Sequence, residues 1–154
     1  MLRLHGFTAA FILTMFAAVG QMTADNVDQW AQADLMPAAE LNRQLSAVKA
    51  GKIILLQVGF QVLYKQGHIP GSQYAGPGSK TEGLAALGKL VGKLPRRQEI
   101  VIYCGCCPWE ECPNIRPAFR ALKQMGFSNV KVLNLPTRLG ADWVAKGYPL
   151  TRGE

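Results

Sequence analysis

All four cysteines of the chain lie in one short stretch, "CGCCPWEEC", between residues 104 and 112. A cysteine thiolate is both a nucleophile and a soft metal ligand. The stretch could therefore support sulfur transfer or thiol–disulfide exchange, disulfides that brace a loop, or the binding of a soft metal ion. It contains no histidine, arginine or lysine, and its charged residues are Glu110 and Glu111.

The spacing of the cysteines leaves their partners open. Cys104 and Cys107 form a CxxC pair, in which one turn brings two thiols together and the thiol pKa is often lowered. Cys106 forms a CxC pair with Cys104. A bridge between the neighbours Cys106 and Cys107 would be strained, whereas a Cys107–Cys112 bridge would close the loop and leave Cys104 free. Four thiolates from nine consecutive residues would strain a tetrahedral metal site, so a low-coordinate copper site is easier to build.

The cysteine stretch lies between a predicted strand and a predicted helix. The apolar run Ile100–Tyr103 is typical of a buried strand, and Asn114–Met125 carries Ile115 and Leu122 on one helical face. Cys104 therefore ends a strand. The start of the following helix offers unpaired N–H groups and partial positive charge, which favour an anionic sulfur. The pattern predicts a cradle for a thiolate or for its persulfide.

The rest of the chain alternates strands with helices. Apolar runs predict two more buried strands, over Ile53–Val58 and Val130–Leu133. Helical spacing predicts three more helices, over residues 36–51, 81–95 and 140–147, and residues 67–80 form a loop rich in glycine and proline. This alternation predicts an α/β fold, with a central and mainly parallel sheet and helices on both faces. In such a sheet, ligands bind beyond the carboxyl ends of the strands, where Cys104 lies.

The N-terminus has the pattern of a secretory signal peptide. Arg3 precedes an uncharged apolar run of 14 residues, 7–20, and a small, polar stretch follows. The run is short for a membrane span, so we predict a signal peptide over 1–24, cleaved after Gly20 or Ala24, with an uncleaved anchor as the alternative. Residues 25–34 would form a lead-in. We expect export into a bacterial periplasm, where disulfides persist, and no stable membrane span after cleavage.

Composition indicates one globular domain, which we place at residues 35–150 with a tail at 151–154. The hydrophobic share of 49% argues against disorder, and the net charge is +7. The densest basic cluster, which we call the basic segment, is Lys89, Lys93, Arg96 and Arg97. No aromatic residue lies between these charges, so we predict a solvated basic surface and no nucleic-acid binding.

Several motifs together resemble the rhodanese-like domain family over about residues 35–150. They are "GHIPG" at 67–71, the strand that ends in Cys104, "KQMGF" at the end of the next helix, "NVKVLNL", and Trp143 followed by "KGYP". The resemblance implies a sulfurtransferase in which Cys104 attacks a sulfane sulfur, becomes a persulfide and passes the sulfur to a nucleophile such as a protein thiol. The alternative is a non-catalytic module whose cysteines hold copper, zinc or a protein partner.

Two departures from the family pattern affect the substrate. The first strand ends "QVG" at 57–59 in place of an Asp-Val-Arg-like stretch, so an Asp–Arg pair is missing. The loop after Cys104 is longer than usual and has no arginine, the residue suited to paired hydrogen bonds with thiosulfate or phosphate. Related phosphatases need an arginine six positions after the cysteine, where this chain has Glu110. We therefore exclude a phosphatase and expect thiosulfate to be a poor donor.

These patterns assign roles to individual residues. We predict Cys104 as the nucleophile and Cys107 as a resolving thiol. We predict that His68 orders its loop by hydrogen bonding, with a catalytic base as the alternative. Contacts to substrate are expected from Gly105, Cys106, Trp109 and Arg116. Structural roles are expected for Gly67, His68, Pro70, Gly71, Cys112 and Trp143. No cofactor is expected unless copper or zinc binds, in which case the ligands would be Cys104, Cys106, Cys107 and Cys112.

Overall fold

A five-stranded, all-parallel sheet forms the centre of the structure, a computed structural model that describes residues 31–153. The strands are β1 (Leu35–Pro37), β2 (Ile53–Gln57), β3 (Gln73–Tyr74), β4 (Glu99–Tyr103) and β5 (Val130–Asn134). Their spatial order is β1-β5-β4-β2-β3. The predicted signal peptide, 1–24, and most of the predicted lead-in lie outside the described residues. Within 31–153, no helix is both long and apolar enough to cross a membrane.

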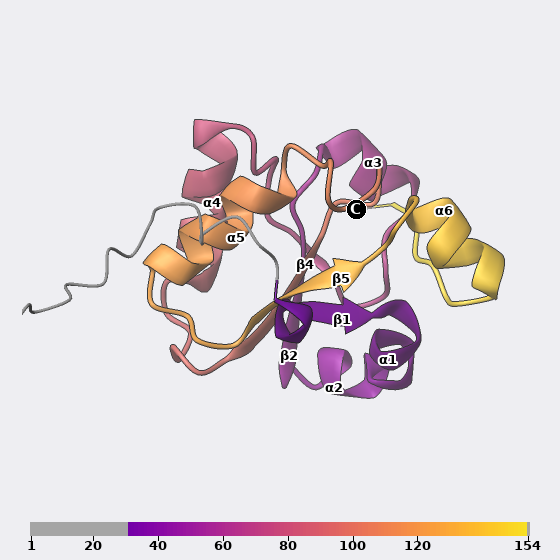
Figure 1. Cartoon of the computed structure of the whole chain (residues 1–154), viewed down its shortest axis with the longest axis horizontal. Helices are drawn as coiled ribbons and strands as arrows, with labels where there is room; N and C mark the ends of the chain where they lie inside the picture. The colour runs from indigo at the N-terminus through magenta and orange to yellow at the C-terminus, as the bar shows by residue number, and fades with distance from the viewer. Residues whose placement is uncertain (1–30, 154) are drawn as a thin grey trace, which may run out of the picture.

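Helices cover both faces of the sheet, as Figure 1 shows. The α-helices are α1 (Ala38–Arg43), α2 (Leu45–Lys49), α3 (Gln61–Gln66), α4 (Thr81–Val91), α5 (Ile115–Gln124) and α6 (Leu139–Asp142). Two 3-10 turns, η2 (Gln32–Asp34) and η3 (Val144–Lys146), complete the elements. Helices α4 and α5 lie on one face, and α1 and α2 lie on the other. The predicted fold class is therefore confirmed.

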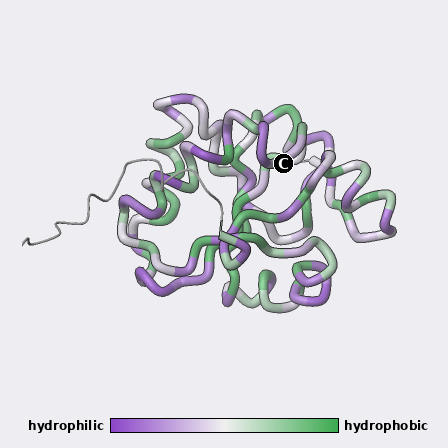
Figure 2. Tube along the Cα trace, viewed as in Figure 1, coloured by the Kyte–Doolittle hydropathy of each residue, from purple (hydrophilic) through white to green (hydrophobic). Residues whose placement is uncertain are grey.

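Strand β4 shows how one run of residues serves both faces. Successive side chains of a strand point to opposite faces. Ile100 and Ile102 accordingly pack with α4 and α5, while Val101 and Tyr103 pack in the second core with α1 and α2. Figure 2 shows the central strands as hydrophobic segments of the chain. The same alternation places the next residue, Cys104, on the α4–α5 face.

The three predicted strands are present within about two residues of their expected bounds. Their continuous apolar runs are explained by burial on both faces. Strands β2 and β4 pair over their full length, from Ile53 with Glu99 to Gln57 with Tyr103. This register places the carboxyl ends of the two strands side by side, so the residues that follow Gln57 and Tyr103 meet at one edge.

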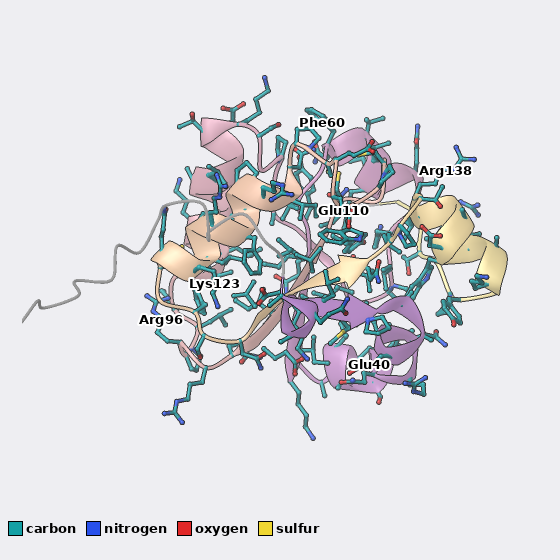
Figure 3. The ribbon with its side chains drawn as sticks, in the orientation of Figure 1. Glu40, Phe60, Arg96, Glu110, Lys123 and Arg138 are labelled. Carbon is teal, nitrogen blue, oxygen red and sulfur yellow. The ribbon has the colours of Figure 1, made fainter. Side chains whose placement is uncertain are left out.

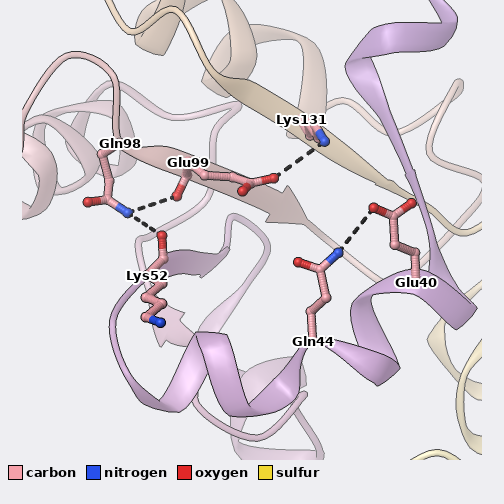
Figure 4. Close-up of polar contacts among 6 residues, drawn as sticks. All are labelled: Glu40, Gln44, Lys52, Gln98, Glu99 and Lys131. Carbon is pink, nitrogen blue, oxygen red and sulfur yellow. Dashed lines mark hydrogen bonds and ion pairs between the residues drawn. The ribbon is translucent and has the colours of Figure 1, made fainter.

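The helix predicted in 36–51, from near Pro37 to Gly51, is present within about two residues of both ends but is not continuous. Met36 and Pro37 belong to β1, and the remainder is two helices that meet at Gln44. Gln44 has φ −101° and ψ 12°, outside the regular helix, and its N–H donates to the carbonyls of Glu40 and Leu41. Its side-chain amide also donates to the Glu40 carboxylate at 3.1 Å, as Figure 4 shows. The break lets the two short helices follow the curved sheet separately.

Polar contacts fasten the amino ends of the strands, far along the sheet from Cys104. The Gln98 amide donates to the Lys52 carbonyl at 2.7 Å, and Glu99 pairs with Lys131 at 3.3 Å across β4 and β5 (Figure 4). Part-exposed ion pairs of this kind contribute only about 0–1 kcal/mol. These contacts join the amino ends of the strands, whereas the cysteine loop lies at their carboxyl ends.

The "GHIPG" segment is held by His68. Its ring stacks on Tyr64 with centroids 3.9 Å apart, and Nδ1 lies 2.9 Å from the Tyr64 carbonyl oxygen. Its backbone forms an antiparallel bridge with Thr151, in the stretch assigned to the tail. A Cβ on Gly67 would come within 2.6 Å of the end of the Leu150 side chain, which would have to shift. His68 therefore joins α3 to the C-terminal segment.

Candidate active site: the cysteine loop

Cys104 is the first residue beyond β4, and its side chain is almost fully buried, at 4% exposure. Gly59, which follows β2, lies directly against it: a Cβ added there would come within 2.7 Å of the Cys104 sulfur. The chain then turns at Gly105, whose φ of +86° lies in the left-handed region that favours glycine. The Leu139 N–H donates to the Gly105 carbonyl at 3.0 Å, so α6 supports the turn.

Gln57 occupies the place of the missing Asp–Arg pair. It is buried at 2% exposure, and its amide donates to the Cys104 carbonyl at 3.1 Å. Its side-chain oxygen accepts the N–H of Gly59 at 3.2 Å. One neutral amide thus uses both a donor and an acceptor to join the ends of β2 and β4. The start of the cysteine loop is held without a buried charge.

Trp109 anchors the middle of the loop. The Trp109 side chain is 7% exposed and packs in the same core as Cys104 and Cys112. Its backbone N–H donates to the Leu135 carbonyl at 3.3 Å. The buried Trp109 side chain thus helps to keep water away from the two buried sulfurs. Both ends and the middle of the loop are thus fixed. The exposed residues of the loop near the thiols are Cys106, Glu110 and Glu111.

Three of the four sulfurs meet. The Sγ atoms of Cys104, Cys106 and Cys112, which we call the three-sulfur cluster, all lie within 4.8 Å of one another. The sulfurs of Cys104 and Cys106 are 3.3 Å apart. Cys107 lies beside Cys106, with 3.0 Å between their sulfurs, and is outside the cluster. All four thiols are free, so neither the Cys107–Cys112 bridge nor the vicinal bridge is formed.

Asn114 supplies polar contacts to the cluster from the start of α5. Its side-chain N–H donates to the Cys104 sulfur at 3.6 Å, and its side-chain oxygen accepts the N–H of Ser79 at 3.1 Å. The second bond fixes which end of the amide faces the sulfur. Asn114 is 1% exposed, so water does not replace these contacts. The structure thereby adds a residue that the sequence analysis treated only as the beginning of a helix.

The cluster holds negative charge at Cys112. A hydrogen bond donated by Cys104 lowers the pKa of Cys112 to about 5, against an opposing effect of burial and with help from the backbone N–H groups of Asn114 and Ile115. The same hydrogen bond, together with burial, raises the pKa of Cys104. Burial raises the pKa of Cys107 to about 12. Cys104 and Cys112 therefore share one proton, which rests on Cys104 while Cys112 carries the negative charge.

The predicted substrate contacts are only partly gathered. Gly105, Cys106 and Trp109 surround Cys104 through the turn, the exposed sulfur and the buried indole. Arg116 lies in the first turn of α5 and is half-buried. The resolving role predicted for Cys107 would require its sulfur to move toward Cys104, because Cys106 and Cys112 already lie there. Trp143, for which a structural role is predicted, is fully buried between α6 and η3, in agreement with that role.

Gly59→Ala tests whether Cys104 needs its observed position. The new methyl group would lie 2.7 Å from both the Cys104 sulfur and the Gln57 amide, which must move. Because both are ends of side chains, we expect a small loss of stability and a loss of Cys104 reactivity toward a thiol probe of roughly tenfold or more. The control is Gly88→Ala, where nothing lies within 4 Å and reactivity should be unchanged. Equal reactivity of the two variants would contradict the assigned geometry.

Solved structures with the same fold were found at low sequence identity. The BH2092 protein from Bacillus halodurans is 23% identical, with 78% of this chain and 77% of that one covered and a TM-score of 0.60. The rhodanese-like domain of the Alr3790 protein from Anabaena sp. is 22% identical, with 77% and 79% covered and a TM-score of 0.55. A thiosulfate sulfurtransferase from Pseudomonas aeruginosa is 19% identical, with 79% of this chain but 21% of that one covered and a TM-score of 0.56.

These likenesses establish the fold, and the family follows from the sequence match. No curated protein sequence matches the chain. The model of the rhodanese-like domain family matches residues 38–135, from the start of α1 to the residue after β5. The matched segment covers well over half of the chain and contains the whole cysteine loop. The chain therefore belongs to the rhodanese-like domain family.

Proposed function

We propose that the protein is a sulfurtransferase or persulfide carrier with Cys104 as its nucleophile. The observation that carries this proposal is the position of Cys104. It follows β4 directly at the carboxyl edge of the sheet, and the Asn114 amide at the start of α5 points at its sulfur. N–H donors beside a sulfur stabilise a terminal anionic sulfur atom as well as a thiolate. Membership of the rhodanese-like family supports the same chemistry.

The reaction consists of two sulfur-transfer steps, and both take place at the Cys104 sulfur. Cys104 and Cys112 share one proton, and Cys104 reacts when this proton lies on Cys112: its thiolate then attacks the outer sulfur of a donor R–S–SH. A bond forms between the Cys104 sulfur and that outer sulfur, the donor S–S bond breaks, and R–S⁻ leaves. An acceptor thiolate then attacks the outer sulfur of the Cys104 persulfide and departs as a new persulfide, which restores Cys104. Asn114 and Cys112 are placed to hold the anionic sulfur in both steps.

We propose a neutral or polymeric sulfane donor, or a protein persulfide, over thiosulfate. Residues 104–114 contain no cationic side chain, and Glu110 and Glu111 are exposed there. In Figure 3, Arg96 of the basic segment and Lys123 of α5 both lie away from Glu110 and Phe60. A dianionic donor would approach two carboxylates, although salt screens exposed charges over about 8 Å.

A protein thiol is the acceptor that the surface beside Cys104 favours. Phe60 follows Gly59, the residue in contact with Cys104, and is 46% exposed. Val62, in α3, is 59% exposed. Large apolar side chains exposed beside a reactive group are typical of contact with another protein. This acceptor class stays a proposal, and an acceptor that lacks apolar groups should receive sulfur more slowly.

Donor preference provides the test of this function. We expect the reduced protein to gain one sulfur atom at Cys104 on treatment with a low-molecular-weight alkyl persulfide R–S–SH, which carries at most one negative charge, at least about tenfold faster than with dianionic thiosulfate at equal concentration, because of the unfavourable charge of thiosulfate. Intact and peptide mass spectrometry under anaerobic conditions would measure both rates and locate the added sulfur. No added sulfur with either donor would contradict the proposed function. A faster reaction with thiosulfate would contradict the assigned donor class.

A further inference from the structure

We infer that Cys104, Cys106 and Cys112 form a three-coordinate thiolate site for Cu(I), and that Cys107 is not one of its ligands. Three sulfurs around one ion at metal–sulfur distances of ~2.3 Å would lie ~4 Å apart. The sulfurs of the three-sulfur cluster lie within 4.8 Å of one another, with 3.3 Å between Cys104 and Cys106. Small side-chain rotations would therefore complete the site.

The fold fixes two of the ligands and exposes the third. Cys104 follows β4 and Cys112 comes shortly before α5, and these thiols are 4% and 2% exposed. Between them, the hydrogen bond from the Trp109 backbone N–H to the Leu135 carbonyl and the turn at Gly105 fix the path of the loop. Cys106 is exposed, so an ion can first bind its sulfur and then reach the two buried ones. This arrangement provides a route of entry and a shielded final position.

The donor set favours a soft ion with low coordination. Thiolates bind both Cu(I) and Zn(II), but structural zinc sites almost always have four ligands in a tetrahedral arrangement, so a set of three thiolates favours Cu(I). Among the described residues, no further cysteine, histidine, aspartate or glutamate joins the cluster. His68 is already stacked on Tyr64 and has its Nδ1 at the Tyr64 carbonyl. Cys107 contacts Cys106, with 3.0 Å between their sulfurs, but it does not lie within 4.8 Å of all three sulfurs. A tetrahedral Zn(II) site with Cys107 as the fourth ligand would therefore need a larger movement of the loop than the three-sulfur Cu(I) site.

The N–H groups around the three sulfurs suit a site in which the thiolates carry more negative charge than the ion carries positive charge. Three thiolates and one monovalent ion leave a net negative charge, which is costly to bury without hydrogen-bond donors. The Asn114 amide donates to the Cys104 sulfur at 3.6 Å, and the backbone N–H groups of Asn114 and Ile115 face Cys112. These donors are the contacts expected around metal-bound thiolates. Because Cu(I) would occupy Cys104, metal binding and persulfide formation exclude each other.

Anaerobic titration of the reduced full chain with Cu(I), in competition with a chromogenic Cu(I) chelator, tests this site. We expect about one ion per chain, bound through three sulfurs in X-ray absorption spectra. Cys104→Ser, Cys106→Ser and Cys112→Ser should each lower the affinity at least about tenfold. Cys107→Ser is the matched control from the same loop and should bind within about twofold of wild type. Circular dichroism would verify that each variant is folded.

Several results would overturn the site. They are no Cu(I) bound in the presence of the chelator, an equal loss for Cys107→Ser, four sulfurs in the absorption spectrum, or a Zn(II) affinity that exceeds that for Cu(I). The exposed Cys106 keeps the test valid if the buried variants unfold, because Cys106→Ser removes a ligand without opening the core. No sulfur donor is present in this titration, so its outcome is separate from that of the sulfur-transfer assay.

Discussion

Cys104→Ser is expected to lower the rate of sulfur transfer by at least about 10³-fold, because a serine hydroxyl cannot form the persulfide on which both transfers depend. The substitution replaces sulfur by oxygen at a residue that is 4% exposed, so the packing changes little. It also removes the thiol that donates to Cys112. The loss should therefore appear in the formation of the persulfide and in every later step.

The measurement is sulfur transfer from polysulfide to a thiol acceptor, with mass spectrometry of the intact protein after the first step. Thermal unfolding and circular dichroism would verify that the variant is folded. Gly88→Ala serves as the comparison variant, because a Cβ added there would meet no other group within 4 Å and the position is far along the chain from the loop. Retention of more than roughly one tenth of the wild-type rate by Cys104→Ser would show that another thiol is the nucleophile.

Trp143→Ala is expected to lower the free energy of unfolding by about 3–5 kcal/mol, a large part of the roughly 5–15 kcal/mol of a typical domain. Trp143 is fully buried, and its ring meets Tyr148 edge-on with centroids 5.0 Å apart. Its indole N–H donates to the Pro149 carbonyl at 2.7 Å. The substitution would leave a cavity and an unpaired carbonyl beneath α6, the helix that supports Gly105.

Chemical denaturation of wild type, Trp143→Ala and two comparison variants would measure this effect. Trp143→Phe keeps most of the apolar ring but lacks the N–H, so it should lose less, about 1–3 kcal/mol. Val144→Ala, at the next position, removes a side chain that is 43% exposed and should cost less than about 1 kcal/mol. Similar losses for Trp143→Ala and Val144→Ala would contradict the assigned role of the buried indole.

The central strands could be predicted from the sequence because their signal is local. Strands β2, β4 and β5 are continuous apolar runs, since each is buried on both faces. Strands β1 and β3 have three and two residues, which is too short for a recognisable period. Their assignment depends on hydrogen bonds to β5 and β2, which are distant in the sequence. Helix α3 was also missed, because only Tyr64 among its residues is fully buried.

The sequence by itself determined that every thiol lies in one loop after a buried strand, and it determined the family. It also showed that the loop lacks arginine, which constrains the donor. Which sulfurs meet was decided by the tertiary structure. The CxxC spacing favoured Cys107 as the partner of Cys104, whereas the folded loop brings Cys106 and Cys112 to it.

The physical reason is that the loop takes its path from distant parts of the chain. Leu139 supports the turn at Gly105, Leu135 binds the backbone of Trp109, and Gly59 limits the space around Cys104. Gln57 and Asn114 likewise act through partners outside their own segments. The spacing of the cysteines along the chain indicates only which conformations an isolated loop can adopt. Packing against the sheet and α6 selects one of those conformations, and with it the sulfurs that can react or bind together.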